Sequence, residues 1–564
     1  MMIKFYRNNI QKYVKIGIYE IGAIATVAIA ALLRLLLISQ GWPVTDSDES
    51  TIGLMALHIA NHGEHPVFFY GQNYMGSTAA YLVAGLFHLF GASTFTLRLG
   101  SIIFFTLFMI SVYLLTSLLY SKPLALASLI LLSLGSDSML TTELHSIGGY
   151  PETLFFGALV LLLASWLALS PGRETSRYPR QWRYLVYGCW GLAAGLGLWS
   201  NLLIIPIVLV AALLLLVGCW REWRTWAFPC LLLGLVIGAF PLIYYNLTAL
   251  PGQDSWSVLL YIHEVAKVYH LPVINRFKGA FLVSLPIITG VNPSCPVISG
   301  QHIGFSGPDA SRCFVEYAAW GMGFTLLWLI ASVLAIAALW KLRLRTEGQV
   351  WSDVERQTSV RHFARLVLLG SAGLTMFLYA ISPNAALYLQ SNDRYLIGLL
   401  ITVPAVISPL WPGALTAARG ARIIVAAKAM VLLLIGLVFL SGTIGIFQAL
   451  PIAQNVDQQQ EALIHDLLHS HVTRIYSDYW TCDRVTFQSN EQIICAVVDA
   501  QGHPIAIQNR YAAYMAIVQA DQHAAYVLPA GSSMAAAFAR KITQQDVRYQ
   551  HLTFDGYEIY VPVA

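Results

Sequence analysis

The sequence predicts an all-α polytopic membrane protein with about eleven transmembrane helices, followed by a small α/β domain outside the membrane. Only 11% of the 564 residues are charged and 57% are hydrophobic, whereas a water-soluble domain carries roughly a quarter charged residues. Apolar runs of about 20 residues, long enough to cross a bilayer, recur from residue 17 to residue 446. Beyond residue 446 these runs stop, and Gln, Asp and His become frequent.

The apolar runs define the expected spans, and only the run at 123–138 is short for a complete crossing. They lie at 17–39, 95–119, 123–138, 151–170, 184–200, 202–219, 225–245, 317–340, 363–382, 395–413 and 422–446. The first run follows a basic start that resembles a secretory signal, with Lys4, Arg7, Lys12 and Lys15. Its apolar stretch is too long for a signal peptide and no small-residue cleavage site follows, so we expect an uncleaved anchor.

The distribution of Lys and Arg predicts the orientation of the chain. Loops 40–94 and 139–150 contain neither residue. Basic residues gather instead in the alternate segments, at Lys122, Arg173, Arg177, Arg180, Arg183, Arg221, Arg224, Lys341, Arg343, Arg345, Arg356, Arg361, Arg365, Arg419, Arg422 and Lys428. Because cytoplasmic loops carry the excess of basic residues, we expect a multi-pass protein of the inner (plasma) membrane with a cytoplasmic N-terminus. An odd number of spans then puts everything after residue 446 outside.

Two domains are expected, a membrane domain at 1–446 and a soluble extracytoplasmic domain at 447–564. The membrane domain has two large outer loops, 40–94 and 246–316. The first of these indicates two helices at the membrane surface. One covers Asp48–Asn61 and ends at Gly63, and the other covers Tyr74–Phe90 and ends at Gly91, because glycine commonly follows the last helical residue.

The C-terminal domain shows mixed helix and strand patterns, which favour a small α/β or α+β fold. Helices are expected at 457–470 and 511–519, and strands at 472–479, 493–498, 525–528 and 558–563. Four cysteines, Cys295, Cys313, Cys482 and Cys495, fall in segments expected outside, where disulfides form. Proximity pairs Cys295 with Cys313 and Cys482 with Cys495, which is one of the three connectivities that four cysteines allow.

The densest acidic cluster, Asp46, Asp48 and Glu49, directly follows the first span. Carboxylates held at a membrane surface serve as a general base or coordinate a cation. Asp46 and Glu49 also have the spacing of a helix cap, since acidic side chains accept hydrogen bonds from the first helical turn. The two roles are compatible, because a cap also fixes a carboxylate in place.

Further candidates lie at the next outer turns. Glu143, His145 and Glu152 form a second acidic group, and Glu152 follows Pro151 at an expected helix start. Arg394, the only basic residue of its loop, suits bidentate binding of a phosphate, although snorkelling or pairing with Asp393 also accounts for it. Arg34 has the same alternatives.

Other kinds of site are disfavoured. His62, Glu64 and His65 resemble a metal set but lack a defined third ligand, so a solvated turn accounts for them better. The sequence has no phosphate-cradling Gly-rich loop, nucleophile elbow or metalloprotease helix. No basic, aromatic-interleaved patch suggests nucleic acid as a partner.

These motifs together resemble bacterial glycosyltransferases of the GT-C superfamily, of the protein O-mannosyltransferase and aminoarabinose-transferase-like group. The resemblance rests on Asp48-Glu49 after the first span, His65-Pro66, and Tyr70-Gly71-Gln72-Asn73-Tyr74-Met75-Gly76 before the second surface helix. It also includes Gly148-Gly149-Tyr150-Pro151-Glu152-Thr153 and Asp393-Arg394-Tyr395 in later outer loops. It covers about the first 440 residues, where short motifs coincide with the expected topology.

The resemblance implies inverting transfer of a sugar from a polyprenyl-phosphate donor to a hydroxyl of a glycan, lipid or protein acceptor. Asp48 would be the general base and Glu49 would orient it, while Arg394 would stabilise the leaving phosphate. Glu143 and Glu152 would complete the sugar pocket. Asp46 remains the alternative base and, with His65 and Tyr74, a candidate for substrate binding. A divalent cation is a candidate cofactor.

The sequence departs from this group where a Lys-Pro-Pro-like stretch is replaced by Asn73-Tyr74-Met75-Gly76, so a lysine contact to phosphate is missing. Two other functions compete with the transferase. A transporter or lipid flippase would place ionisable residues within the spans, whereas the acidic groups here lie at the outer ends. A sensor or structural protein whose C-terminal domain binds a ligand would leave Asp48 dispensable.

Overall fold

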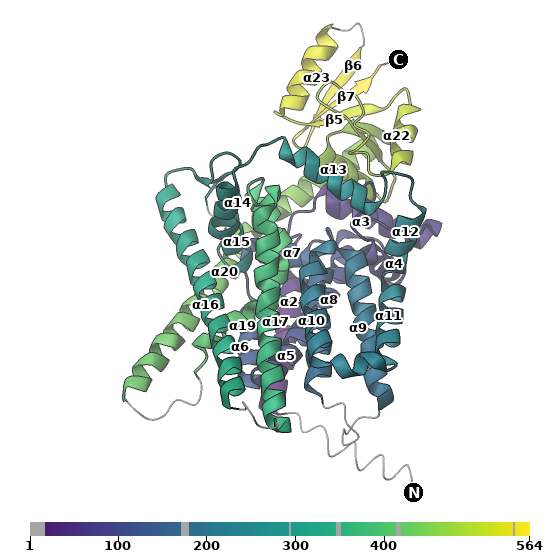
Figure 1. Cartoon of the computed structure of the whole chain (residues 1–564). Helices are drawn as coiled ribbons and strands as arrows, with labels where there is room; N and C mark the ends of the chain where they lie inside the picture. Colours follow the sequence, from purple (N-terminus) through teal and green to yellow (C-terminus); the bar gives the residue numbers. More distant parts are fainter. Residues whose placement is uncertain are drawn as a thin grey trace.

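The computed structural model describes residues 17–170, 180–292, 295–345, 351–412, 419–544 and 548–563. A bundle of long helices forms the body, and a smaller domain containing β5, β6 and β7 sits at one end of it (Figure 1). The bundle comprises α2 (Ile18–Ser39), α5 (Thr94–Leu119), α6 (Lys122–Ser133), α7 (Asp137–Leu144), α8 (Tyr150–Leu169), α9 (Arg180–Ser200), α10 (Ile205–Gly218), α11 (Ala227–Gly238), α12 (Phe240–Thr248), α16 (Ala310–Arg345), α17 (Asp353–Ile381), η6 (Asp393–Thr402), α19 (Val403–Ile407) and α20 (Arg419–His469).

Among the described residues, seven helices are long and apolar enough to cross a membrane, or up to nine if each of two bent pairs is one span. The bent pairs are α6 with α7, at 90°, and α11 with α12, at 65°. The expected span at 184–200 corresponds to α9, which is not apolar enough to be counted as a crossing helix. The expected span at 202–219 corresponds to Leu202–Gly218, which is too short to be counted. The predicted number of eleven is therefore not confirmed.

The outer surface of the bundle is covered by large apolar side chains. Ile21 is 58% exposed, Val333 61% and Leu247 81%. An apolar surface of this extent is unfavourable in water but suits contact with lipid chains. The chain is thus a multi-pass membrane protein, as the sequence predicts.

The first outer loop forms the surface helices α3 (Ser47–Leu57) and α4 (Thr78–Phe90). A π-helical turn, η1 (His58–His62), extends α3 to Gly63, which takes the left-handed conformation with φ 66°. Helix α4 begins later than the predicted Tyr74, because the preceding residues form bridges to other segments, with Met75 facing Asn201. Gly76 approaches the Trp199 carbonyl so closely that a Cβ there would lie 2.0 Å from the oxygen.

The second outer loop lies at the same end of the bundle as the C-terminal domain (Figure 1). It contains α13 (Ser255–Lys267), α14 (Val273–Gly279), η4 (Ala280–Ser284), α15 (Leu285–Thr289) and the hairpin of β1 (Val297–Ile298) and β2 (Gly304–Phe305). A disulfide joins Cys295 to Cys313. The loop is therefore tied to the start of α16.

The C-terminal domain is built on a five-stranded sheet of order β4-β3-β5-β7-β6. Its elements are β3 (Arg474–Ser477), α21 (Tyr479–Gln488), β4 (Ile494–Val497), α22 (Ala512–Gln519), β5 (Ala525–Pro529), α23 (Ser533–Gln544), β6 (Tyr549–Phe554) and β7 (Tyr557–Pro562). Strand β3 is parallel to β4 and β5, whereas β7 is antiparallel to β5 and β6. Three elements, α21, α23 and β6, are additions to the predicted pattern. A disulfide joins Cys482 of α21 to Cys495 of β4.

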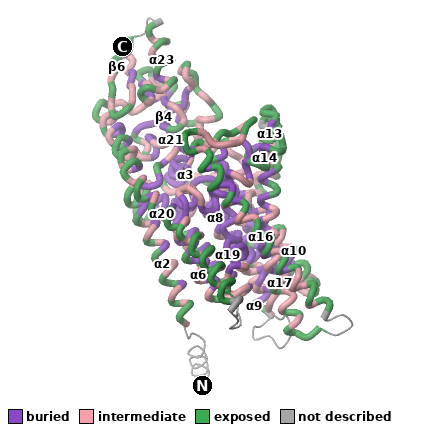
Figure 2. The backbone as a smooth tube through the Cα atoms, turned by 90° about the vertical axis from the view of Figure 1, so that its left-hand side faces the viewer, coloured by how far each residue is buried: buried purple, intermediate pink, exposed green. Residues whose placement is uncertain are grey.

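Helix α20 is continuous from the bundle into this domain, so the predicted boundary between residues 446 and 447 falls inside it. The domain also packs directly on the first outer loop. Met55 of α3, Phe87 of α4 and Phe487 of α21 belong to one buried cluster. Figure 2 shows the buried backbone continuing from the bundle through α3 toward α21. The loop and the C-terminal domain therefore share a core.

Candidate functional site

The N-terminus of α3 presents the acidic cluster that the sequence singles out. Asp46 caps the helix, because its side chain accepts a hydrogen bond of 2.8 Å from the Glu49 backbone amide. The Glu49 carboxylate does not return to the cap and is bound by Arg98 instead. Burial raises the pKa of Asp46, with the His145 imidazole and the cap hydrogen bond acting against it. The capping role is thus present for Asp46 alone.

Glu49 is fully buried and forms an ion pair with Arg98 of α5. Arg98 Nε and Nη2 donate to the two carboxylate oxygens at 3.0 and 2.6 Å. Burial is the largest single influence and acts to raise the pKa of Glu49, but the charges of Arg98 and His145 together with the hydrogen bonds from Arg98 and the Ser146 amide hold the pKa below its usual value. With relative exposures of 0% for Glu49 and 1% for Arg98, this pair connects α3 to the bundle and offers no free oxygen to a substrate.

Asp48 lies on the open side of the same helical turn and meets two residues of the C-terminal domain. Tyr479 Oη donates a hydrogen bond to Asp48 Oδ1. Arg510 Nη2 lies 3.6 Å from the same oxygen and donates to Tyr479 Oη at 3.0 Å. The Asp48 side chain keeps 18% of its exposure, so this carboxylate is fixed but accessible.

The segment before α4 brings further polar groups to Asp48. With its amide oriented to satisfy its neighbours, Gln72 accepts from Arg510 and donates to Tyr74 Oη at 3.3 Å. Burial raises the pKa of Tyr74, and its phenol interacts electrostatically with both Asp48 and Arg394. Residues of the first loop, the C-terminal domain and the bundle therefore converge here.

The side chains of Asp48, Gln72, Tyr74, Tyr479 and Arg510 form a polar cluster. Arg394 forms the side of this cluster that faces the membrane helices. Its guanidinium carbon lies 5.6 Å from the ring centre of Tyr150 and 5.9 Å from that of Tyr395. Its Nε is buried and has no hydrogen-bond partner among the described residues. The alternative of an ion pair with Asp393 is not seen among the described residues, where the Asp393 carboxylate accepts a hydrogen bond from Ser138. A buried donor without a partner is costly, so Arg394 is ready to bind an anion.

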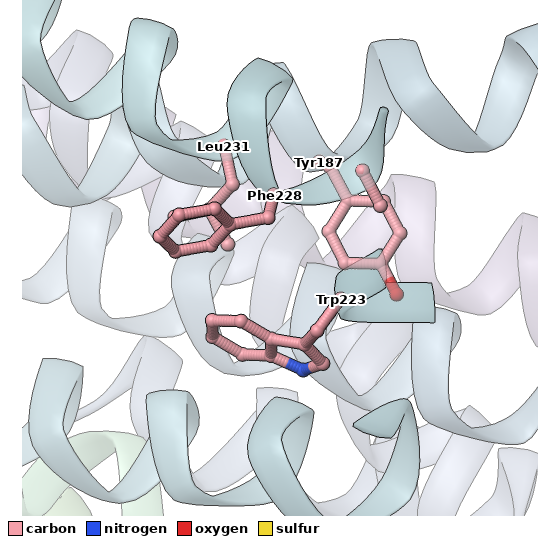
Figure 3. Close-up of a pocket in the computed structure, with 5 residues that line it drawn as sticks. Tyr187, Trp223, Phe228 and Leu231 are labelled. Carbon is pink, nitrogen blue, oxygen red and sulfur yellow. The ribbon is translucent and has the colours of Figure 1, made fainter. Parts of the chain in front are cut away.

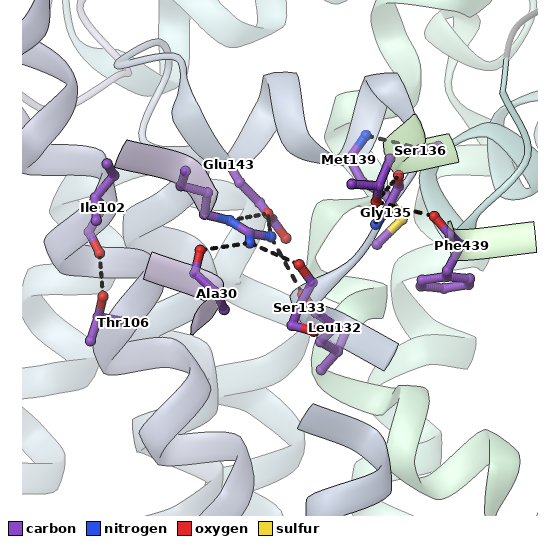
Figure 4. A network of polar contacts seen from close by, with 12 residues as sticks. Ala30, Ile102, Thr106, Leu132, Ser133, Gly135, Ser136, Met139, Glu143 and Phe439 are labelled. Atoms are coloured by element: carbon purple, nitrogen blue, oxygen red, sulfur yellow. Dashed lines mark hydrogen bonds and ion pairs between the residues drawn. The ribbon is translucent and has the colours of Figure 1, made fainter. Parts of the chain in front are cut away.

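Two predicted site residues lie away from the cluster. Glu143 is fully buried and pairs with Arg34, whose Nη2 donates to Oε2 at 2.5 Å. Figure 4 shows Glu143 inside the bundle in a network with Ala30, Leu132 and Ser133. His65 is exposed on the loop after Gly63 and makes no hydrogen bond with a described residue of the cluster. Glu152 is buried in the first turn of α8, beside Tyr150 of the cluster.

The His62, Glu64 and His65 set does not form a metal site. Within the described part of the chain, no group of three or more His, Cys, Asp or Glu side chains has the geometry to hold a metal ion. Glu64 instead accepts hydrogen bonds of 2.7 Å from Tyr70 and Tyr511.

Sequence reasoning missed the residues that join the first loop to the C-terminal domain. Besides Tyr479 and Arg510, a buried His58 of η1 contacts Tyr514 Oη at 3.0 Å and Glu491 Oε1 at 3.2 Å. These partners lie more than 400 positions apart in sequence, at separations of 431 for Tyr479 with Asp48 and 433 for Glu491 with His58. No local pattern carries such a signal.

Two pockets lie within the helix bundle. One, between Tyr187, Trp223, Phe228 and Leu231 (Figure 3), is closed by these side chains and leaves no room for a water molecule. The other has a volume of about 140 Å³ and lies between α15, α16, α19 and α20, with Trp320, Phe324 and Phe439 in its wall. Its lining is almost entirely apolar. Of these two pockets in the described part of the chain, the second suits a hydrocarbon chain.

Comparison with known proteins supports the fold. No protein-family model matches the chain, and no curated protein sequence matches it. Among solved structures, the chain is similar to ArnT from Cupriavidus metallidurans bound to undecaprenyl phosphate, with 12% identity, 96% of this chain and 98% of that chain covered, and a TM-score of 0.55. It is also similar to the archaeal oligosaccharyltransferase AglB from Archaeoglobus fulgidus in complex with an inhibitory peptide and a dolichol-phosphate, with 13% identity, coverage of 95% and 74%, and a TM-score of 0.44.

The ArnT structure aligns over nearly the whole of both chains, so the likeness includes the C-terminal domain as well as the bundle. At this identity the likeness establishes the fold and not the reaction. The chain therefore has a GT-C-like fold, as the resemblance of its sequence motifs implies.

Proposed function

We propose that the protein is a membrane glycosyltransferase that moves a sugar from a polyprenyl-phosphate donor to an acceptor hydroxyl, with inversion and with Asp48 as the general base. The observation that carries the proposal is an accessible carboxylate and a half-buried arginine within one cluster at the end of the bundle. Asp48 supplies the base, and Arg394, with its unpartnered Nε, supplies the phosphate site.

The reaction requires one proton acceptor and one stabilised leaving group. The acceptor oxygen attacks the anomeric carbon while Asp48 removes its proton, and the bond between that carbon and the phosphate oxygen breaks. The electron pair leaves with the polyprenyl phosphate. A fixed guanidinium in a site with little water stabilises this developing charge, which is the role of Arg394.

A segment of the donor's lipid chain would occupy the apolar pocket between α16, α19 and α20, whose volume of about 140 Å³ suits only part of such a chain. Arg394 lies in η6, which continues directly into α19, and Val403 of α19 lines the pocket. At about 2 Å per residue of 3₁₀-helix, the phosphate site and the pocket are roughly 18 Å apart along one element. ArnT, which has this fold, is seen with undecaprenyl phosphate, so a lipid phosphate suits this arrangement.

The remaining candidates take supporting roles. Tyr74, Tyr150 and Glu152 border the sugar, whereas Glu49 and Glu143 hold helices together through their arginine partners. The uneven distribution of Lys and Arg supports a protein of the inner membrane with the cluster and residues 447–564 on the extracytoplasmic side.

The test is transfer of radiolabelled sugar from a panel of polyprenyl-phosphate sugars by the purified protein in detergent. Wild type is compared with Asp48→Asn, which keeps the shape of the side chain but removes the base. We expect transfer by wild type and a loss of about 100-fold or more in the variant, the range that general base catalysis contributes.

Asp46→Asn is the matched control, because it changes the neighbouring carboxylate by the same substitution and asparagine also caps helices well. It should transfer at close to the wild-type rate. Loss in Asp46→Asn with activity retained in Asp48→Asn would move the base to Asp46. Absence of transfer from every donor would contradict the proposal and favour a transporter.

A further inference from the structure

The C-terminal domain reaches into the candidate site through a chain of hydrogen bonds. Arg510 Nε and Nη2 donate to Tyr479 Oη at 3.2 and 3.0 Å, and Tyr479 Oη donates in turn to Asp48 Oδ1. Asp48 thus has its geometry set by residues that follow it by more than 400 positions. Neither residue belongs to the motifs that predict the function.

The chain of hydrogen bonds has a fixed direction. Arginine only donates, so Tyr479 Oη accepts from it and gives its own proton to the carboxylate. Burial, together with the Asp48 charge, raises the pKa of Tyr479 above its usual value, so the phenol keeps its proton at neutral pH. Tyr479 therefore orients Asp48 and does not replace it as a base.

The two oxygens of Asp48 are left in different states. Oδ1 is bound by Tyr479, whereas Oδ2 has no hydrogen bond from any described residue. A carboxylate accepts on both oxygens, so Oδ2 is the atom free to take a proton from an incoming hydroxyl. The hydrogen bond from Tyr479 holds the carboxylate plane in place, so that one oxygen faces Tyr479 and the other faces away from it.

The position of Tyr479 is itself well supported. It begins α21, which Asp478 caps through the Trp480 amide at 2.8 Å. The Tyr479 carbonyl accepts a hydrogen bond from the Ser47 hydroxyl of α3, and one turn further Thr51 donates to Asp483 at 2.7 Å. Helix α21 therefore lies against α3 with Tyr479 facing Asp48.

Resting on the proposed function, we infer that Tyr479, held by Arg510, is a positioning residue of the transferase. Tyr479 binds Asp48 Oδ1 and leaves Oδ2 for the acceptor hydroxyl. The C-terminal domain then completes the active site and is not an appendage. The acceptor proton passes to Asp48 Oδ2, while the proton of Tyr479 stays in place.

The test compares Tyr479→Phe with wild type in the transfer assay. The variant removes one hydroxyl. We expect kcat to fall about 10- to 100-fold, the loss typical when a partner that orients a metal ligand is removed, with the KM for the donor unchanged. Tyr560→Phe is the matched control, since Tyr560 also donates to a carboxylate, that of Glu558 at 2.7 Å, within the sheet of the same domain. It should leave kcat unchanged.

A second comparison separates positioning from a general effect on folding. In the Asp48→Asn background, adding Tyr479→Phe should change the residual rate less than twofold, because Tyr479 acts only through Asp48. If Tyr479→Phe fails to fold, Arg510→Met tests the same chain of hydrogen bonds and should also lower kcat. Arg510→Lys should then have a kcat between those of Arg510→Met and wild type.

The outcomes distinguish this inference from the function on which it rests. Transfer that collapses in Asp48→Asn but proceeds at the wild-type kcat in Tyr479→Phe overturns the positioning role and leaves the transferase intact. A further large loss from Tyr479→Phe in the Asp48→Asn background also overturns it. Wild type that transfers nothing overturns both.

Discussion

Replacing Arg98 by Met should destabilise the protein more than replacing both members of its ion pair. Glu49 is 0% exposed and Arg98 1%, and their hydrogen bonds of 3.0 and 2.6 Å satisfy both carboxylate oxygens. The single variant leaves a carboxylate buried without its cation, which costs about 3–5 kcal/mol. The double variant Glu49→Leu/Arg98→Met replaces the pair by apolar side chains and should recover most of this loss.

The assay is the melting temperature of the purified protein in detergent, followed by tryptophan fluorescence, across a range of pH. The pKa of Glu49 is depressed in the folded state, so its pair adds stability above the ordinary pKa of 4.5 and loses it as pH falls through the lower, folded value. This acid sensitivity should be absent from the double variant.

Two results would refute the reasoning. Equal melting temperatures for Arg98→Met and the double variant would mean that the unpaired charge is not the cause of the loss. A folded double variant that has lost transfer would mean that Glu49 takes part in the reaction, as its place next to Asp48 in the sequence suggests. The structural role predicts transfer within a few-fold of wild type.

Three further predictions concern the cluster and its supports. Gly53→Ala should destabilise the protein by about 1–3 kcal/mol through overpacking and so lower its melting temperature, because a Cβ there would lie 2.5 Å from the Phe487 ring. Phe487→Leu in the same chain should restore part of the melting temperature, and unchanged melting in Gly53→Ala would contradict the close packing. Burial raises the pKa of Asp483 to about 6, so its stabilising contribution is present below its unfolded pKa and is lost as pH rises through 6. Asp483→Asn should therefore melt higher than wild type at pH 8 but not at pH 4, and the same difference at both would contradict the assignment. Arg394→Lys should lower kcat/KM for the donor about tenfold in the transfer assay, since Lys lacks the planar fork, and an unchanged kcat/KM would exclude a phosphate contact.

The parts of this protein that depend on neighbouring residues were predictable from sequence. Apolar length marked the membrane helices, and glycine marked the ends of the surface helices at Gly63 and Gly91, which take positive φ in the structure. The bend between α6 and α7 was not visible, because the run at 123–138 continues in composition across a turn of 90°. Apolarity alone does not record where a helix breaks.

The candidate site was predictable only in part. Asp48 was singled out by the resemblance, and Arg394 because it is the only basic residue of its outer loop. Glu49 and Glu143 were also expected in the site, but each is paired with an arginine from another helix. Such pairing depends on side-chain positions across the bundle, which spacing along one helix does not give.

Two arginines border the cluster, and their partners decide which of them meets the donor phosphate. Arg510 lies beside Gly71 and Gln72 of the first outer loop, but Tyr479 and Gln72 already engage its guanidinium. Arg394 stacks near two tyrosine rings and keeps a buried Nε without a partner among the described residues. Leaving a buried donor unpaired is unfavourable, so a phosphate gains more at Arg394 than at Arg510. Arg510 is better suited to hold the proposed base, so we expect the donor phosphate of the proposed reaction to meet Arg394.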